Sequence, residues 1–253
     1  MNADVAERVA LDDEPECEGF ERVDRGDVRY KLGPDALPWS NGVAYARWRP
    51  EEVATRAKEI IDIFRSRNVR FTWQIGPNTD AVGLSSVLAA NGLQREIDAL
   101  LLTSKIPIRG RLPEHDLRLV EEHDERTAAD AIRTDRDRSP DEVRARLEAR
   151  MRYLTCPDRR GGGVVAYRRD LAVGYGAWRY GSDGETVLLH TASTLRPHRR
   201  TGVYTAILGW RLDRAVREGK TIAVVVAERA TSAPILMRKG FRELGALQIW
   251  MAV

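Results

Sequence analysis

The sequence predicts an α/β (more closely α+β) protein made of two similar halves, each a mixed sheet with flanking helices. Hydrophobic periodicity gives both halves the same order of strand, helix, strand, helix, strand. The joint before the closing strand is similar in both, at residues 92–96 and 240–243. A Pro-, Gly- and Arg-rich segment at 105–113 separates the halves as a linker. The first half lacks the N-terminal elements with which the second half begins.

The first half is expected to form a domain at residues 26–104, after a flexible lead at 1–25. The start of the lead is acidic and has neither the basic nor the apolar region of a signal peptide. The first helix carries apolar side chains at helical spacing, among them Ile60, Ile61 and Phe64. The predicted elements are a strand at 42–48, a helix at 51–68, a strand at 69–75, a helix at 81–91 that stops at Gly92, and a strand at 95–103.

The second half, a domain at 114–253, begins with an additional front part. There Pro140 follows Ser139 at a first helical turn, which is a typical helix start. The predicted elements are a strand at 117–120, helices at 127–138 and 139–153, a hairpin of 163–168 with 172–180, a strand at 186–194, a helix at 202–218, a strand at 221–227, a short helix at 232–239 and a strand at 242–253.

Composition excludes several classes of protein. The chain has 253 residues, 43% apolar and 31% charged, with a formal net charge of +3. Acidic and basic residues are interspersed, which argues against a nucleic-acid partner, because such proteins gather Lys and Arg on one face. No apolar run approaches the roughly 18 residues of a membrane span, so we expect no membrane partner and a cytoplasmic location. Cys17 and Cys156 lie far apart without metal-ligand spacing, and a disulfide between them stays open.

A basic, glycine-containing turn, Leu195–Tyr204 (LRPHRRTGVY), lies between a predicted strand and a predicted helix. The first backbone N–H groups of a helix lack intrahelical partners and, with the helix dipole, attract anions. Gly202 lets an anion approach the backbone, and Arg199 and Arg200 add positive charge. The turn therefore predicts a phosphate site. The alternative is an ordinary strand–helix turn with solvated arginines.

These residues resemble the GNAT superfamily of acyl-CoA-dependent N-acyltransferases, strongly over 117–253 and more weakly over 39–102. The family's acyl-CoA motif is Arg or Gln, two residues, Gly, one residue, then Gly or Ala, and Arg199–Tyr204 (RRTGVY) is similar to it. A second signature, a short helix ending in Gly-Phe, resembles residues 230–241 (ATSAPILMRKGF). The whole chain resembles the tandem type, with a degenerate N-terminal copy and an intact C-terminal one.

The resemblance implies that acetyl-CoA is the co-substrate and that its pyrophosphate lies on the turn. The pantetheine arm would run between the strands at 186–195 and 221–227, as an added strand does. The oxyanion donor would be a backbone N–H near the end of the first strand, which makes Leu195 the candidate. The residues implied for cofactor binding are Leu195, Arg199, Arg200, Thr201, Gly202, Val203, Tyr204, Thr205 and Ser232.

The sequence departs from the family pattern where a proton donor is expected. Leu236 stands where the family often carries a tyrosine that acts as general acid for the leaving thiolate, and leucine cannot donate a proton. Arg229 stands where an asparagine is usual. Tyr204 replaces a Gly or Ala, and it would supply the missing acid only if it faced the thioester; otherwise it packs or stacks nearby. Tyr175 is a further candidate for the acid, again only if it faces the thioester.

Amine acylation needs a base that takes the proton from the attacking ammonium. His190 is the first candidate, and strict alternation places it on the same face of its strand as Leu188, Ala192 and Thr194. The alternative is a hydrogen-bonded histidine on a half-buried strand. Glu228 ends the next strand and is the second candidate, unless it is a solvated strand-end carboxylate.

The first half has no phosphate turn. Pro50 removes an amide donor, and Glu51 and Glu52 repel phosphate, so we expect this half to bind no acyl-CoA. The sequence thus predicts an N-acetyltransferase that transfers an acetyl group from acetyl-CoA to a primary amine by direct attack in a ternary complex. The acceptor would be a small-molecule or peptide amine, and the chain a monomer or homodimer. The alternative is a non-catalytic acyl-CoA-binding or scaffolding protein of the same fold.

Overall fold

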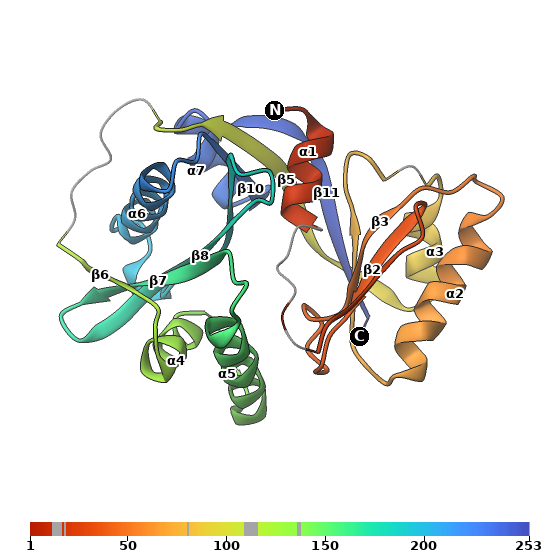
Figure 1. The fold of residues 1–253 in the computed structure, drawn as a ribbon, viewed down its shortest axis with the longest axis horizontal. Coiled ribbons are helices and arrows are strands. Elements are labelled where there is room, and N and C mark those ends of the chain that lie inside the picture. Colours follow the sequence, from red (N-terminus) through yellow and green to blue (C-terminus); the bar gives the residue numbers. More distant parts are fainter. Residues whose placement is uncertain (12–16, 18, 80, 109–115, 136–137, 253) are drawn as a thin grey trace. The chain divides into compact units, whose positions relative to one another are not determined.

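The computed structural model describes residues 1–11, 17, 19–79, 81–108, 116–135 and 138–252 (Figure 1). The chain is mixed α/β and divides into two compact units. The first takes its described residues from Met1–Asp13, Gly19–Leu102 and Val226–Val253, and the second takes them from Glu14–Glu18 and Thr103–Val225. The predicted boundary after residue 104 is close to that division, and the linker at 105–113 lies partly outside the described residues. The last segment, however, lies in the first unit and not with residues 114–225.

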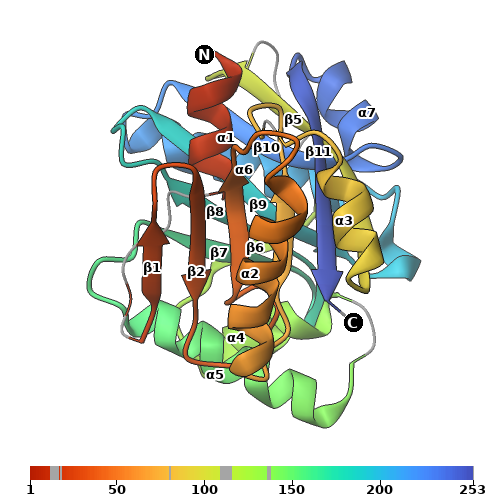
Figure 2. The same ribbon diagram turned by 90° about the vertical axis from the view of Figure 1, so that its right-hand side faces the viewer.

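The strands of the first unit lie in the order β1-β2-β3-β4-β11-β5. β3 and β4 are parallel and joined by α2, and α2 and α3 cover one face of these strands (Figure 2). β11 pairs antiparallel with β4, so the last strand of the second half completes the sheet of the first. The elements are α1 (Ala3–Leu11), β1 (Glu21–Asp24), β2 (Val28–Leu32), β3 (Gly42–Ala46), α2 (Val53–Ser66), β4 (Thr72–Ile75), α3 (Leu84–Ala90), β5 (Leu93–Lys105), α7 (Ser232–Arg238) and β11 (Arg242–Ala252).

The predicted flexible lead is wrong for much of its length. Its start is the helix α1, which buries Ala6, Val9 and Leu11. Its end is the hairpin of β1 with β2. In β2 the buried side chains of Val28, Tyr30 and Leu32 alternate with half-buried ones, which is the period-2 pattern of a strand with one face in the core.

Glu7 of α1 is a buried carboxylate. Its Oε2 accepts a hydrogen bond from the backbone N–H of Asn78 (2.8 Å), and its Oε1 is buried without a hydrogen-bond partner among the described residues. Burial raises the pKa of Glu7 above its ordinary value of 4.5, against the opposing effect of the hydrogen bonds from Asn78. The folded protein therefore favours the protonated carboxyl, and the charged form costs stability.

We expect Glu7→Gln to increase the free energy of unfolding at neutral pH by on the order of 1 kcal/mol, because glutamine keeps an acceptor without the charge. Because folding raises the pKa of Glu7, the contribution of this group to the stability of the wild type is greatest at a pH below its unfolded pKa. That contribution is lost as the pH rises through the folded pKa. The advantage of the variant should thus grow with pH from about pH 4 to about pH 7. Urea unfolding at both pH values measures it, and a pH-independent difference would contradict the account.

The strands of the second unit lie in the order β10-β9-β8-β7-β6. β6 to β9 form an antiparallel meander, and β9 and β10 are parallel and joined by α6. α6 covers one face of this sheet, and α4 and α5 lie on the other (Figure 1). Among the described residues, no helix has the length and apolar character needed to cross a membrane. The elements are β6 (Arg118–Glu121), α4 (Glu125–Arg133), α5 (Pro140–Thr155), β7 (Gly161–Arg168), β8 (Leu171–Tyr180), β9 (Thr186–Thr194), α6 (Val203–Arg217) and β10 (Ile222–Glu228).

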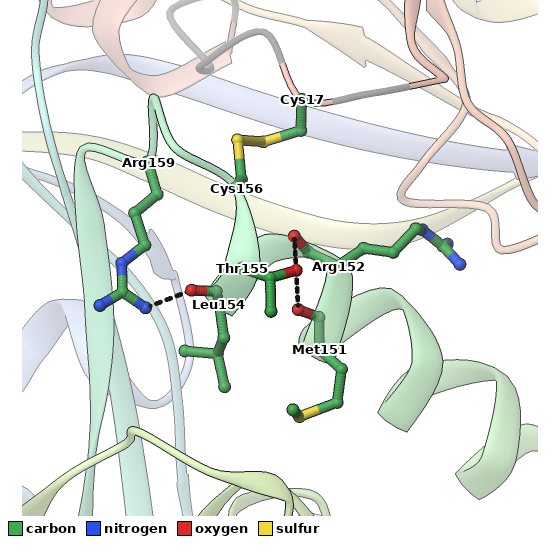
Figure 3. The surroundings of a disulfide bond; sticks show 7 residues. All are labelled: Cys17, Met151, Arg152, Leu154, Thr155, Cys156 and Arg159. Carbon is green, nitrogen blue, oxygen red and sulfur yellow. Dashed lines mark hydrogen bonds between the residues drawn. A yellow bond between two sulfur atoms is a disulfide. The ribbon is translucent and has the colours of Figure 1, made fainter.

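A disulfide joins Cys17 to Cys156, which resolves the pairing that the sequence leaves open (Figure 3). Cys156 is the C-terminal cap of α5. The end of that helix is held locally, since the Thr155 hydroxyl donates to the carbonyl of Met151 (2.9 Å) and Arg159 donates to the carbonyl of Leu154 (2.8 Å). The bond therefore links a segment near the N-terminus to a helix end that is ordered by its own contacts.

We expect Cys17→Ser to lower the free energy of unfolding by about 4 kcal/mol, because the bond closes a loop across a sequence separation of 139 and restricts the unfolded chain. Denaturant unfolding with and without reductant measures this. The wild type should lose the same stability in reductant, and the variant should be insensitive to it. Equal stability of the two proteins without reductant would contradict the prediction.

Candidate functional site

The loop between β9 and α6 has an ordered main chain. A single 3-10 turn, Arg196–His198, is followed by extended Arg199 and by two left-handed residues, Arg200 (φ 64°) and Gly202 (φ 88°). The Thr201 hydroxyl donates to the His198 carbonyl (2.8 Å), and Arg199 Nε donates to the carbonyl of Thr194 (3.2 Å). The glycine is suited to its position, because other residues adopt this backbone conformation at a cost.

The N-terminus of α6 offers backbone donors to an anion. The first described intrahelical bond is that from the Ala206 amide to the Gly202 carbonyl (2.9 Å), so the amides of Val203, Tyr204 and Thr205 point out of the helix end. The dipole of this 15-residue helix adds partial positive charge, and the left-handed turn before it orients further N–H groups. The residues expected to cradle phosphate, Arg199 to Thr205, therefore surround a helix end that fits a phosphate group.

Arg168, which no local sequence pattern indicates, also reaches this loop. It ends β7, and its guanidinium lies 3.5 Å from the Thr201 hydroxyl and 3.5 Å from His198 Nδ1. The contact depends on the register of the β7–β8 hairpin, in which Arg168 lies opposite Leu171. A local sequence pattern contains no signal for that register. The loop thus gathers a further cation, which strengthens its attraction for anions.

A β-bulge interrupts β9 at Thr191. Ala177 of β8 pairs with His190, whereas the preceding Gly176 pairs with Ala192, so Thr191 has no partner on β8 and adopts φ 40°. Directly paired side chains share a face. His190 therefore shares its face with Ala177, and Ala192 lies on the opposite face.

The bulge corrects the predicted placement of His190. Ala177 packs with Tyr175 and with Ala131 of α4, so the His190 side chain lies on the α4 face. The α6 face is marked by Gly174, where an added Cβ would meet Val203 and Ile207 of α6. Thr194 pairs with Gly174, and so it lies on the α6 face together with Ala192. The prediction that His190 shares a face with those two residues is wrong, since it assumed unbroken alternation.

Hydroxyl and carboxylate groups line the α4 face near His190. Ser193 pairs with Tyr175, and its hydroxyl lies 2.6 Å from that of Thr134 at the end of α4. The Tyr175 hydroxyl donates to Glu122 (3.2 Å), a buried carboxylate that also forms an ion pair with Arg150. Tyr175 is thus engaged with Glu122 and is poorly suited to donate a proton to a leaving thiolate.

The structure separates the other predicted donors from His190. The Leu195 amide donates to the carbonyl of Val173 (3.0 Å), so it is committed to β8, and its predicted role as oxyanion donor is wrong. Tyr204 lies on α6 near Arg211, and burial raises the pKa of its hydroxyl. It does not share the α4 face with the His190 side chain.

The remaining predicted residues lie in the part of the chain assigned to the first unit. Glu228 ends β10, and its carboxylate accepts a hydrogen bond from the Thr231 hydroxyl (2.5 Å). Ser232 begins α7, and Leu236 is fully buried within it. Arg229 donates to Asp98 through its backbone N–H (3.0 Å). Neither Leu236 nor Arg229 supplies the acid that the family pattern usually places here.

The corresponding helix start in the first half carries negative charge. Glu52 precedes α2, and its carboxylate accepts hydrogen bonds from the side chain and backbone of Arg49. These bonds hold the pKa of Glu52 below its ordinary value, so the group is ionised at neutral pH. A carboxylate at this helix end repels phosphate, which is the reason given by the sequence for expecting no acyl-CoA in this half. That expectation stays a prediction.

Solved structures with the same fold are found among N-acetyltransferases. A GCN5-related N-acetyltransferase from Kribbella flavida has a TM-score of 0.67 at 18% identity, covering 92% of this chain and 90% of that one. A functionally unknown conserved protein from Staphylococcus epidermidis has a TM-score of 0.73 at 12% identity, covering 96% and 95%. A tandem GNAT protein from the clavulanic acid biosynthesis pathway has a TM-score of 0.60 at 17% identity, covering 94% and 84%.

No protein-family model matches the sequence, and a comparison with curated proteins finds no match. The likeness to solved structures covers both halves of the chain and concerns the fold. The predicted fold class, mixed α/β with two GNAT-like halves, is confirmed.

Proposed function

We propose that this chain, which has the fold of the GNAT N-acetyltransferases, transfers an acetyl group from acetyl-CoA to a primary amine. The observation that carries the proposal is the loop from Arg199 to Thr205, where a helix N-terminus, two left-handed residues and several cations meet. Those groups bind the pyrophosphate of acetyl-CoA. Acetyl-CoA supplies the activated acyl group as a thioester.

His190 is the proposed general base. In a ternary complex the amine nitrogen attacks the thioester carbonyl, a C–N bond forms and the C–S bond breaks. His190 takes the proton that the amine nitrogen must lose, and the sulfur leaves as the thiolate of CoA. No covalent enzyme intermediate is involved. Glu228 is the second candidate for the base, and Tyr204, which does not share the face of the His190 side chain, is not proposed as the acid.

The Thr191 amide replaces the Leu195 amide as the proposed oxyanion donor. The N–H of Thr191 and the C=O of His190 belong to one planar trans peptide and point in opposite directions. The His190 carbonyl points toward α6, where Arg211 donates to it (3.3 Å). The amide of Thr191 therefore points away from α6, toward the face that holds the His190 side chain, where it can stabilise a developing negative charge.

The second candidate function is acyl-CoA binding without catalysis. Leu236, buried where a proton donor is usual, favours it, as does the engagement of Tyr175 with Glu122. Release of thiol from acetyl-CoA, measured with a panel of small amines and peptide N-termini, distinguishes the two. Amine-dependent release supports the transferase, and acetyl-CoA binding without release under every amine supports the alternative.

A further inference from the structure

Arg211 of α6 is a buried cation beneath the β9 bulge. Its side chain is only 2% exposed, and Nη1 donates to the carbonyl of Ala177 (2.8 Å) and to that of His190 (3.3 Å). Ala177 and His190 form the last cross-strand pair before the extra residue Thr191. One guanidinium thus holds both strands at the point where their register changes.

Gly176 makes room for this guanidinium. A Cβ built on Gly176 would lie 2.5 Å from Ile207 Cγ2, 3.0 Å from Arg211 Cζ and 3.1 Å from Arg211 Nε. These contacts are tighter than those of ordinary Cβ atoms, and the glycine does not have the left-handed backbone that would otherwise explain it. Gly176 is therefore explained by close packing of α6 on the strand, through both Ile207 and Arg211. The bulge at Thr191, Gly176 and Arg211 are therefore in direct structural relation, since the arginine packs on the glycine and donates to the residue pair that precedes the bulge.

Arg211 remains charged although carbonyl oxygens are its only described acceptors. Burial lowers its pKa to about 10, which leaves it protonated at neutral pH. Among the described residues, no carboxylate forms an ion pair with it, and its Nε is buried without a hydrogen-bond partner. A buried charge held in this way is costly, and an apolar side chain at such a site is often neutral or more stable. Stability is therefore a weak reason for an arginine here.

We propose that Arg211 is a positioning residue, which holds the carbonyls of Ala177 and His190 toward α6 and so fixes the bulge at Thr191. This inference rests on the proposed function. The bulge keeps the His190 side chain and the Thr191 amide on the α4 face. It also brings Ser193 to that face, because a one-residue change of register exchanges the two faces of a strand. Without Arg211, β9 loses the contact that holds this register.

The test compares Arg211→Met, Arg211→Lys and a matched control, Arg217→Met, which changes an exposed arginine in the last turn of the same helix. Two readouts are measured on the full chain: hydrogen exchange of the β9 amides without any ligand, and steady-state acetyl-CoA turnover with the best amine of the panel. Binding of 3′,5′-ADP monitors the loop, and a cooperative thermal transition shows that each variant folds.

In Arg211→Met the backbone amides of residues 190–194 should exchange their hydrogens faster than in the wild type. The value of kcat should fall by about 100-fold, the loss that a misplacement of about 1 Å can cause. KM for acetyl-CoA and the affinity for 3′,5′-ADP should change much less than kcat, because the helix-end amides of Val203 to Thr205 belong to α6 and not to β9. Arg211→Lys, which keeps a charged donor, should recover part of kcat, and Arg217→Met should match the wild type.

Wild-type exchange at residues 190–194 in Arg211→Met would overturn the proposal. So would faster exchange with unchanged kcat, or a rise in KM with kcat unchanged. If the wild type turns over no amine, the proposed function fails separately, and the exchange measurement still decides whether Arg211 holds the bulge. If Arg211→Met does not fold, Arg211→Lys takes its place with the same two readouts.

Discussion

Gly202→Glu is expected to weaken acetyl-CoA binding by at least about 100-fold. Gly202 is left-handed (φ 88°) immediately before α6, and a non-glycine residue there costs roughly 1–2 kcal/mol. The carboxylate would also stand at the helix end where the phosphates bind, and its charge opposes theirs. The strain would distort the loop that holds the phosphates and the charge would repel them, so we expect a loss of about 100-fold or more. Isothermal titration calorimetry measures it.

Gly184→Glu is the matched control for this variant. Gly184 is also left-handed (φ 78°), lies in the same unit, and has open space at its Cβ position. It precedes β9, whereas the loop follows β9, so the same change should leave acetyl-CoA affinity unaltered. Wild-type affinity in Gly202→Glu would show that the phosphates bind elsewhere.

His190→Gln is expected to lower kcat by about 100-fold or more, because general-base catalysis contributes about 10²–10⁴ in rate. Acetyl-CoA affinity should stay unchanged, since the phosphate loop does not include this side chain. Single-turnover kinetics with saturating acetyl-CoA, together with calorimetry, separate the two effects. The expected signature is loss of the chemical step with binding intact.

His123→Gln controls for the loss of an imidazole. His123 follows β6 and is exposed, with Nδ1 close to the carbonyl of Glu121 (2.8 Å), and nothing in the mechanism uses it. Its variant should turn over at the wild-type rate. Unchanged kcat in His190→Gln would exclude His190 as the base and direct attention to Glu228.

Local signals predicted most of the elements. The apolar spacing of the helix that begins near Val53, and the glycines that end helices at Gly92 and Gly240, are local signals, and these three helices were predicted close to their observed bounds. The helix α1 was missed, because the start of the chain was predicted to be a flexible lead. The hairpin of β1 with β2 was missed although β2 alternates clearly. The exchange of β11 into the first unit was also missed, because pairing with β4 joins residues far apart in sequence.

In the candidate site, too, the sequence predicted the parts that depend on neighbouring residues and missed those that depend on tertiary contacts. The loop at Gly202 carries its own signal, since charge, glycine and helix start are adjacent in the chain. The bulge at Thr191 has no such signal, and without it alternation placed His190 on the wrong face. Arg168 and Arg211 join the site only through strand pairing and helix packing. Sequence patterns could not predict these parts of the site, because they depend on contacts between residues that are far apart in the chain.

Calorimetric titration of the intact wild-type chain with acetyl-CoA tests the central claim most directly. The loop from Arg199 to Thr205 is the proposed site, and the corresponding helix start in the first half carries Glu52. We predict one acetyl-CoA bound per chain, in competition with 3′,5′-ADP. The absence of binding, or a stoichiometry of two, would contradict the account.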